Sequence, residues 1–567
     1  MRWVVRFSIC ATFVSGAIAH ADWPTGGIPI ANGSQIQRDA FALPSANGDL
    51  RAFWVVGATS AIHAQRMRLD GTPAPGWPPG GRMVVDTPAG SSYEAAADDG
   101  SGGALIAWYE WRPQAQGIYC ARMDVNGVVV PGWNPTGALA SRVDSPNQTW
   151  MQNLEICRDA SGGAFITWAD PRFQVPPPGY DTPTPTNVYA QHLRNDGTRD
   201  PAWPDSGRAM VVGSLVGTKQ NVPERLVPDG AGGFWLVCRT PSGTVLLHRD
   251  AAGDSLGTWS FAGGDPAMVE DGAGGVYLTY AGANVYVVRI GPDGPAPGWP
   301  ATGVPVSSYG YGTSLTESGD GGVVVAWHED QFEYPYGEFF RASRIDANGI
   351  ILPEWTIPPT FGTTTQGLGW QCLISPDGHG GGLFAFSRIY QSIFAIAVHE
   401  DAVIPPAFPN EGLRLVPSGG GYLRAMVPDF RGGAYVIWDS PYNSVDQGDV
   451  YASHFSRNGE IGGTTGVPPY PSPPSSKIAL SAPAPNPTTG AASFHLALDV
   501  AGEARVEILD LAGRTVSVVH EGALAAGRHS FTWNGRDRQG RVLPAGLYLV
   551  RANSNGSESV RRIVRVR

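Results

Sequence analysis

One pattern recurs along most of this 567-residue chain and limits what the chain can fold into. It is an Asp, a glycine cluster and a short apolar run, as in the segment DGAGGFWLV at 229–237. A Gly-rich loop that cradles phosphate is followed by Lys-Ser/Thr and a helix, and neither follows here. The pattern is therefore a structural repeat. Its copies are a glycine-free first one at 51–56 and seven that begin at Gly102, Gly162, Gly232, Gly274, Gly321, Gly381 and Gly432.

Two other segments repeat with it. A strand of alternating apolar and polar residues follows each glycine-led run and ends in a tight turn such as Asp70-Gly71 or Asn126-Gly127. A Trp-Pro turn that leads to a glycine then begins at Trp23, Trp77, Trp133, Trp203 and Trp299, with weaker copies at Trp259, Trp355 and Phe408. About four short strands in a period of roughly 55 residues, without a helical pattern, predict an all-β chain built of propeller blades.

The phase of the repeat predicts how the ring closes. The chain enters with a Trp-Pro strand at 23–30, and no further Trp-Pro strand follows the last alternating strand at 450–455. We therefore expect residues 22–460 to form an eight-bladed β-propeller in which the segment 23–35 supplies the outer strand of the last blade.

The two ends of the chain differ from the repeats. Residues 1–21 have two arginines, an apolar run and small residues, the pattern of a signal peptide, which predicts export to the cell surface or the medium. Loss of Arg2 and Arg6 takes the formal charge from −11 to −13, which argues against a nucleic-acid partner. No later stretch is long and apolar enough for a transmembrane helix. Residues 461–477 have the Gly, Pro and Ser content of a linker.

From residue 478 to 567 the strand spacing changes, and strands at 491–498, 504–509, 528–533, 546–551 and 559–566 predict a small β-sandwich. The motifs VEILDLAGR at 506–514, WNGRD at 533–537 and LPAGLY at 543–548 resemble the Ig-like C-terminal domain family shared by flagellar hook-capping (FlgD-like) proteins and type IX secretion sorting domains. The resemblance implies a secreted or surface protein and, in the type IX branch, a sorting signal read by the secretion machinery. The upstream repeats resemble those of secreted bacterial β-propeller proteins, which implies no particular catalytic residue.

The repeated polar and aromatic residues have structural interpretations. The Asp before each glycine cluster could belong to a calcium loop, but calcium needs several converging oxygen ligands and each turn usually offers one carboxylate. The pattern favours an Asp that caps a tight turn, and we predict no cofactor. The repeated Trp108, Trp168, Trp327 and Trp438 end apolar runs and indicate packing between blades. Four cysteines remain beyond the signal segment, and both buried thiols and disulfides stay open for them.

The loops between the second and third strands of the blades vary in length and composition, which makes them the predicted ligand-binding positions. Aromatic rings beside carboxylates suit recognition of a carbohydrate or a surface protein. Ordinary loop variability is the alternative. The candidate ligand-binding residues are Trp111, Arg112, Phe173, Tyr180, Phe332, Tyr334 and Tyr336.

The sequence therefore predicts a secreted or cell-surface binding or scaffold protein without catalytic residues. The alternative is an extracellular hydrolase acting on polysaccharide, for which Glu329, Asp330 and Glu333 could supply the paired carboxylates.

Overall fold

The structure is a computed structural model of the whole chain. It describes residues 23–24, 26–31, 35–57, 61–112, 115–142, 152–170, 186–212, 222–331, 337–364, 368–388, 392–416, 421–440, 448–462, 478–480, 483, 486, 488–498, 501–510, 513–525, 527–554 and 557–566. Within these residues the chain is all-β, and the one short helix is a 3-10 turn, η1 (Pro353–Trp355). No described helix is long and apolar enough to cross a membrane.

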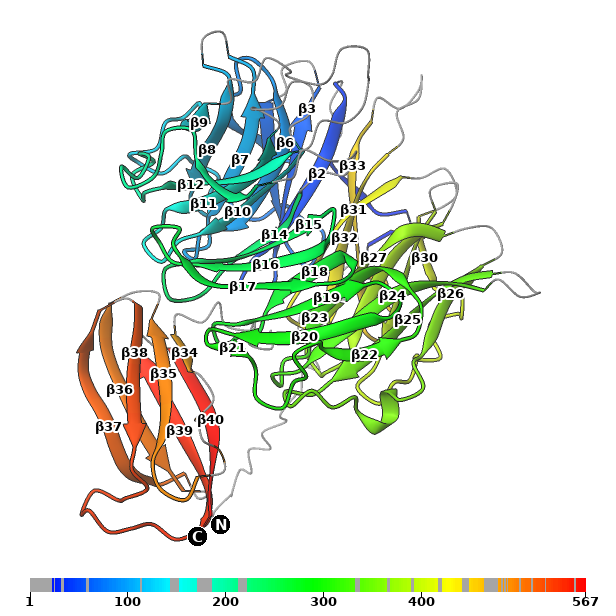
Figure 1. The fold of residues 1–567 in the computed structure, drawn as a ribbon. Coiled ribbons are helices and arrows are strands. Elements are labelled where there is room, and N and C mark those ends of the chain that lie inside the picture. Colours follow the sequence, from blue (N-terminus) through cyan, green and yellow to red (C-terminus); the bar gives the residue numbers. More distant parts are fainter. Residues whose placement is uncertain are drawn as a thin grey trace, which may run out of the picture.

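Eight antiparallel sheets follow one another in a propeller-like array (Figure 1). In seven of them the strands pair in chain order, except that in the fifth sheet β22 pairs with β20. The first four are β2 (Gln37–Pro44), β3 (Leu50–Val56), β4 (Ala61–Met67) and β5 (Arg82–Val85); β6 (Ser91–Asp98), β7 (Ala104–Glu110), β8 (Gly117–Met123) and β9 (Ala138–Arg142); β10 (Gln152–Arg158), β11 (Ala164–Asp170), β12 (Asn187–Leu193) and β13 (Arg208–Val211); and β14 (Val222–Pro228), β15 (Phe234–Thr240), β16 (Gly243–Arg249) and β17 (Ser255–Phe261).

The next three sheets continue the series. They are β18 (Gly264–Glu270), β19 (Val276–Ala281), β20 (Val285–Gly291), β21 (Gly294–Pro295) and β22 (Val304–Ser307); β23 (Tyr311–Glu317), β24 (Val323–Gln331), β25 (Gly337–Ile345) and β26 (Thr360–Thr364); and β27 (Leu368–Pro376), β28 (Gly382–Arg388), β29 (Ser392–Val398) and β30 (Leu413–Val416).

The eighth sheet joins the two ends of the array. It contains β31 (Tyr422–Pro428), β32 (Gly433–Asp439), β33 (Val450–Ser456) and, on its outer edge, β1 (Ile28–Ala31). β1 pairs with β33, with Ile28 opposite Ala452, which is the pairing that the repeat phase predicts. The first strands of consecutive sheets are neighbours all the way round, and β31 lies beside β2. The array is therefore a closed ring.

The Asp of the repeat caps the turn before the second strand. In the fourth sheet, Asp229 Oδ1 accepts hydrogen bonds from the backbone N–H groups of Ala231 and Gly233, each at 2.8 Å. The same bonds form at Asp99, Asp159, Asp271, Asp377 and Asp429. A Cβ on Gly233 would lie 2.1 Å from the carbonyl oxygen of Arg249, so no larger residue fits there. The predicted capping role is confirmed at these six turns. In the sixth sheet Ser318 holds the equivalent position, and Asp320 accepts the Ser318 hydroxyl and the backbone N–H of Gly322, the latter at 3.2 Å.

A basic residue of the third strand holds the other carboxylate oxygen of these turns. His248 Nε2 lies 3.0 Å from Asp229 Oδ2. The equivalent partners are Arg122 for Asp99, His192 for Asp159, Arg289 for Asp271 and His454 for Asp429. Each of these five Asp residues therefore ties the start of the second strand to the third strand of its own sheet, whereas Asp377 pairs with Arg457, which follows β33 of the next sheet, at 3.1 Å.

The two kinds of repeated Trp lie between sheets. Trp108, Trp168, Trp327 and Trp438 are buried in clusters that contain residues of the preceding sheet, which confirms their predicted packing role. The Trp of the Trp-Pro turn donates to a carbonyl of the following sheet, as Trp133 Nε1 does to Asn195 at 2.8 Å. We call this contact the Trp latch. Equivalent bonds join Trp23 to Leu69, Trp203 to Ala251, Trp299 to Ala347 and Trp355 to Glu400.

One predicted copy of this turn is wrong. Trp259 lies inside β17, opposite Leu246, and its ring is tilted against that of Trp235 with the ring centroids 5.6 Å apart. In the fourth sheet a direct hairpin joins β16 to β17, so the third and fourth strands have no Trp-Pro turn between them.

The C-terminal residues form two sheets around a separate core. One contains β34 (Ile478–Leu480), β35 (Ala492–Leu498) and β38 (Gly527–Trp533), and the other contains β36 (Gly502–Leu509), β37 (Thr515–Leu524), β39 (Gly546–Ser554) and β40 (Ser557–Arg565). Phe494 and Leu496 of the first sheet share a cluster with Val506 and Val550 of the second. The predicted strands are present, but β34 and β37 are additional, and β37 is a largely half-buried edge strand without an apolar run.

Candidate functional site

The described strand ends that border the variable loops lie at one end of the ring, which we call the loop face. Because neighbouring strands are antiparallel, the connections from second to third strands and the connections from one sheet to the next emerge at the same end. The capped Asp turns lie at the opposite end. Side chains that could bind a ligand through the variable loops therefore belong to the ends of second strands and the starts of first and third strands.

The structure describes two of the seven predicted ligand-binding residues. Trp111 follows β7 on the loop face and is 44% exposed. Arg112 is turned back into the sheet, where its guanidinium lies 3.8 Å from the centre of the Tyr119 ring and 2.7 Å from buried Glu110. Phe173, Tyr180, Phe332, Tyr334 and Tyr336 lie outside the described residues.

The acidic residue two positions after the repeated Trp is structural. Glu110 Oε2 accepts the indole N–H of Trp108 at 2.9 Å, and Glu329 Oε1 accepts that of Trp327 at 2.6 Å. Arg341 lies 3.2 Å from the other oxygen of Glu329. Glu329, one of the carboxylates considered for hydrolysis, is therefore held in the sheet framework, and Glu333 lies outside the described residues.

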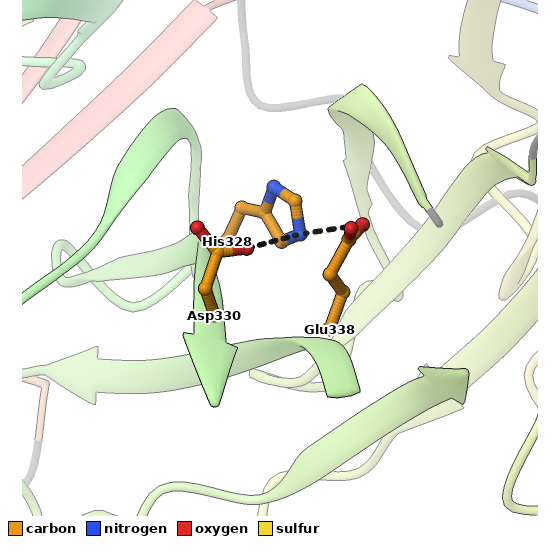
Figure 2. A group of neighbouring side chains, drawn as sticks. All are labelled: His328, Asp330 and Glu338. Atoms are coloured by element: carbon orange, nitrogen blue, oxygen red, sulfur yellow. Dashed lines mark ion pairs between the residues drawn. The ribbon is translucent and has the colours of Figure 1, made fainter. Parts of the chain in front are cut away.

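A cluster of ionisable side chains lies at the loop-face end of the sixth sheet. We call His328, Asp330 and Glu338 the β24–β25 cluster (Figure 2). His328 Nε2 is 3.9 Å from Asp330 Oδ1 and 3.6 Å from Glu338 Oε2, and the three ligand-type atoms all lie within 4.8 Å of one another. A divalent cation could be held by this set.

The lengths and register of two strands create the cluster. The second strands of the other ring sheets have six or seven residues, whereas β24 and β25 have nine each. Residues 328 and 330 share one face of β24 because side chains alternate along a strand. Asp330 pairs with Glu338 across the hairpin, so the two carboxylates are direct neighbours. Like charges placed opposite one another are destabilising unless a cation compensates them.

Aromatic rings surround the histidine. The rings of Tyr311 and Phe340 lie 4.6 and 5.1 Å from the His328 ring, and His328 is only 2% exposed. Burial lowers the pKa of His328 although the two carboxylates oppose that shift, so its imidazole is neutral at pH 7. The Tyr311 hydroxyl donates to Asp330 at 3.0 Å, and burial together with this carboxylate raises the pKa of Tyr311.

Sequence reasoning named Asp330 as an acidic loop residue but missed Glu338, Tyr311 and the role of His328. The signal that could have found Glu338 is the hairpin pairing of residues 330 and 338, which depends on the length of the loop between them.

A separate cavity of about 410 Å³ lies at the Asp-turn end of the ring, lined by the last residues of all eight first strands. Glu317 is part of its wall. Burial raises the pKa of Glu317 to about 8, helped by the charges of Glu270 and Asp271. Nearby Glu155 has its pKa raised to about 7 by burial, although Arg225 acts in the opposite direction. Both carboxyls lose their proton at high pH, which destabilises the fold. The lining also contains Asp98, Cys157 and Glu270, but among the described residues no three metal-ligand side chains converge there.

The fold and site define a propeller-like all-β protein with a two-sheet C-terminal module. Residues 484–558 match the model of the FlgD Ig-like domain family, which confirms the resemblance carried by the C-terminal motifs. No curated protein sequence matches the chain.

Several solved structures resemble the chain. One is PorZ, a surface component of the type IX secretion system of Porphyromonas gingivalis, with 11% identity over 95% of this chain and 82% of that chain and a TM-score of 0.25. A quinoprotein alcohol dehydrogenase-like protein from Bacteroides thetaiotaomicron has 10% identity over 56% and 65% and a TM-score of 0.30. A post-proline cleaving enzyme from Rickettsia typhi has 10% identity over 82% and 58% and a TM-score of 0.32. Likenesses at this level carry no inference about function.

Proposed function

We propose that this protein is a secreted or cell-surface binding scaffold. Residues 22–460 are an eight-bladed β-propeller, closed by the N-terminal strand, whose loop face recognises an extracellular ligand. Residues 461–477 are a linker, and residues 478–567 are an Ig-like module for secretion or surface attachment. The signal peptide expected at 1–21, which lies outside the described residues, would export the chain.

The observation that carries the proposal is the distribution of exposed rings. In the described parts of the chain, the exposed aromatic side chains are Trp111, Tyr309 and Tyr422, at 44%, 42% and 51% exposure. Trp111 follows a second strand, Tyr309 precedes β23 and Tyr422 begins β31, so all three are on the loop face. Exposed apolar residues at the Asp-turn end, such as Ile350, Ile357 and Val403, are aliphatic.

Exposed aromatic rings suit a carbohydrate or peptide ligand. A flat ring offers a large apolar face with little conformational entropy to lose, and a tyrosine hydroxyl adds a directed hydrogen bond. Tyr309 lies beside Tyr311, with ring centroids 6.4 Å apart, and Tyr311 contacts Asp330. Stacking and hydrogen bonding are thus available at neighbouring positions, which supports a carbohydrate or a surface protein as the partner.

The match of residues 484–558 to the FlgD Ig-like domain family supports the role of the C-terminal module. The resemblance to type IX sorting domains makes the secretion machinery a partner of this module. The module would then deliver the propeller to the outer surface or hold it there.

A binding screen tests the loop-face proposal. The full chain is applied to a glycan array and to cell-surface extracts, with and without calcium, beside a variant with Trp111→Ala, Tyr309→Ala and Tyr422→Ala. The control carries Ile350→Ala, Ile357→Ala and Val403→Ala, which removes the same number of exposed apolar side chains at the other end. We expect the aromatic variant alone to lose binding by at least about tenfold. Equal binding by both variants would remove the loop face as the binding surface.

One observation favours the second candidate, an extracellular polysaccharide hydrolase. The carboxylates of Asp330 and Glu338 converge, with their nearest oxygens within 4.8 Å, close to the separation of about 5–5.5 Å in retaining glycosidases. A hydrolase would release reducing sugar from a polysaccharide panel, and Asp330→Asn or Glu338→Gln would abolish the release. Binding without release of sugar would leave the scaffold function.

A further inference from the structure

His328 is buried with neither ring nitrogen hydrogen-bonded. The imidazole is only 2% exposed, and both Nδ1 and Nε2 lack a hydrogen-bond partner within the described residues. A buried imidazole in a folded protein almost always has a partner, because an unsatisfied polar atom costs the desolvation of that atom. The other buried histidines of the ring follow this rule, since His192, His248 and His454 each contact a turn-capping Asp.

The unpartnered Nε2 faces the two carboxylates of the β24–β25 cluster. Its distances to Asp330 Oδ1 and Glu338 Oε2, 3.9 and 3.6 Å, are too long for hydrogen bonds (Figure 2). Ligand atoms about 2.1 Å from a tetrahedral ion are roughly 3.4 Å apart. The two distances from Nε2 are therefore a few tenths of an ångström wider than a metal centre requires, and the two carboxylate oxygens, which lie within 4.8 Å of each other, would also move closer through side-chain rotation when an ion binds.

We propose that His328, Asp330 and Glu338 bind one divalent first-row transition cation, with zinc as the representative ion. An imidazole nitrogen with two carboxylate oxygens suits such ions, whereas calcium and magnesium take oxygen ligands. The two positive charges balance the two opposed carboxylates. Each of the three side chains supplies one ligand atom.

The surroundings fit a metal centre that is open on one side. Tyr311 donates to Asp330 at 3.0 Å, and the backbone N–H of Leu368 donates to Glu338, so both carboxylates are oriented by a second layer of hydrogen bonds. The rings of Tyr311 and Phe340 hold the imidazole in place. The Asp330 and Glu338 side chains are 25% and 34% exposed, so the remaining coordination position faces the loop face and solvent.

This inference does not depend on the proposed ligand recognition, because the metal alone is the probe. The full chain is stripped with a chelator and titrated with zinc chloride by isothermal calorimetry. The test variants are Glu338→Gln and Asp330→Asn, which keep the side-chain shapes, and the control is His379→Ala, which removes an exposed imidazole at the Asp-turn end. Circular dichroism checks that every variant folds.

We expect one zinc per chain for the native protein and His379→Ala, and a loss of affinity of at least about 100-fold in both cluster variants. Cobalt(II) substitution should give visible absorption bands that Glu338→Gln loses. A native chain that takes up no stoichiometric zinc, or cluster variants that bind zinc as the native chain does, would overturn the proposal. In those cases a solvent molecule bonded to His328 accounts for its unpartnered nitrogens.

Discussion

Replacement of Trp23 tests the closure of the ring. Trp23 is 4% exposed, its indole N–H donates to Leu69 at 2.9 Å, and its ring packs 5.9 Å from that of Tyr435. It therefore ties the last sheet to the first. Removing a buried Trp side chain costs about 3–5 kcal/mol of unfolding free energy. A ring of roughly 430 residues has an unfolding entropy of about 0.9 kcal/mol/K, so Trp23→Ala should lower Tm by about 3–6 °C.

The matched control is Trp133→Ala. Trp133 makes the same latch to Asn195 at 2.8 Å and is equally buried, but it joins the second and third sheets, whose strands come from continuous stretches of chain. Both variants should lose similar Tm in a calorimetric scan. Only Trp23→Ala should raise amide hydrogen exchange in β1 and β33, because β1 is held to the eighth sheet by strand pairing and side-chain packing without a continuous stretch of chain. A Tm within 1 °C of the native value, with β33 as protected as before, would refute the closure argument.

Three other predictions follow from single positions. Gly27→Ala should destabilise the ring far more than Gly76→Ala, measured by thermal melting, because both have φ near +80° but a Cβ on Gly27 would lie 2.2 Å from Trp438 while Gly76 has open space. Unfolding free energy should fall by up to about 1.4 kcal/mol per pH unit between about pH 5 and 8, because Glu317, with a pKa of about 8, keeps a proton that the unfolded chain releases; urea titrations should show a smaller slope for Glu317→Gln. Cys120, Cys157, Cys238 and Cys372 are free and buried, so a thiol reagent should label none of them in the native chain and all four after denaturation.

Local patterns made most of the ring predictable. The Asp before Gly233 and the alternating third strands depend on contacts within a few residues, and the sequence shows them directly. The closure by β1 was predictable because a Trp-Pro strand precedes the first repeat and no such strand follows the last one. By contrast, the third-strand partner of each capping Asp was not predictable. The partner of Asp229 is His248 whereas that of Asp271 is Arg289, so no single residue type repeats at this position of the third strand.

The sequence predictions failed for residues whose role depends on the register between paired strands or on a repeat element that one sheet lacks. Trp259 resembles the Trp of a latch, but a shorter hairpin places it within β17. β37 has no apolar run because it is an edge strand that the sandwich core covers only in part. Glu338 looked like an ordinary acidic residue because its position opposite Asp330 is fixed by the pairing of β24 with β25.

The same repeat that fixes one end of the ring leaves the other end free to vary. At the Asp-turn end, a glycine that admits no side chain and a carboxylate with three partners leave almost no position for a new group, as at Gly233 and Asp229. At the loop face, a hairpin can lengthen without disturbing the Trp that ends the conserved part of the strand. In the sixth sheet β24 continues four residues past Trp327, two more than β7 continues past Trp108, and the two added residues include Asp330, which lies opposite Glu338 and beside His328. A chemically distinct site thus arises from a two-residue extension of a structural repeat, which is why the repeat predicted the fold but not the cluster.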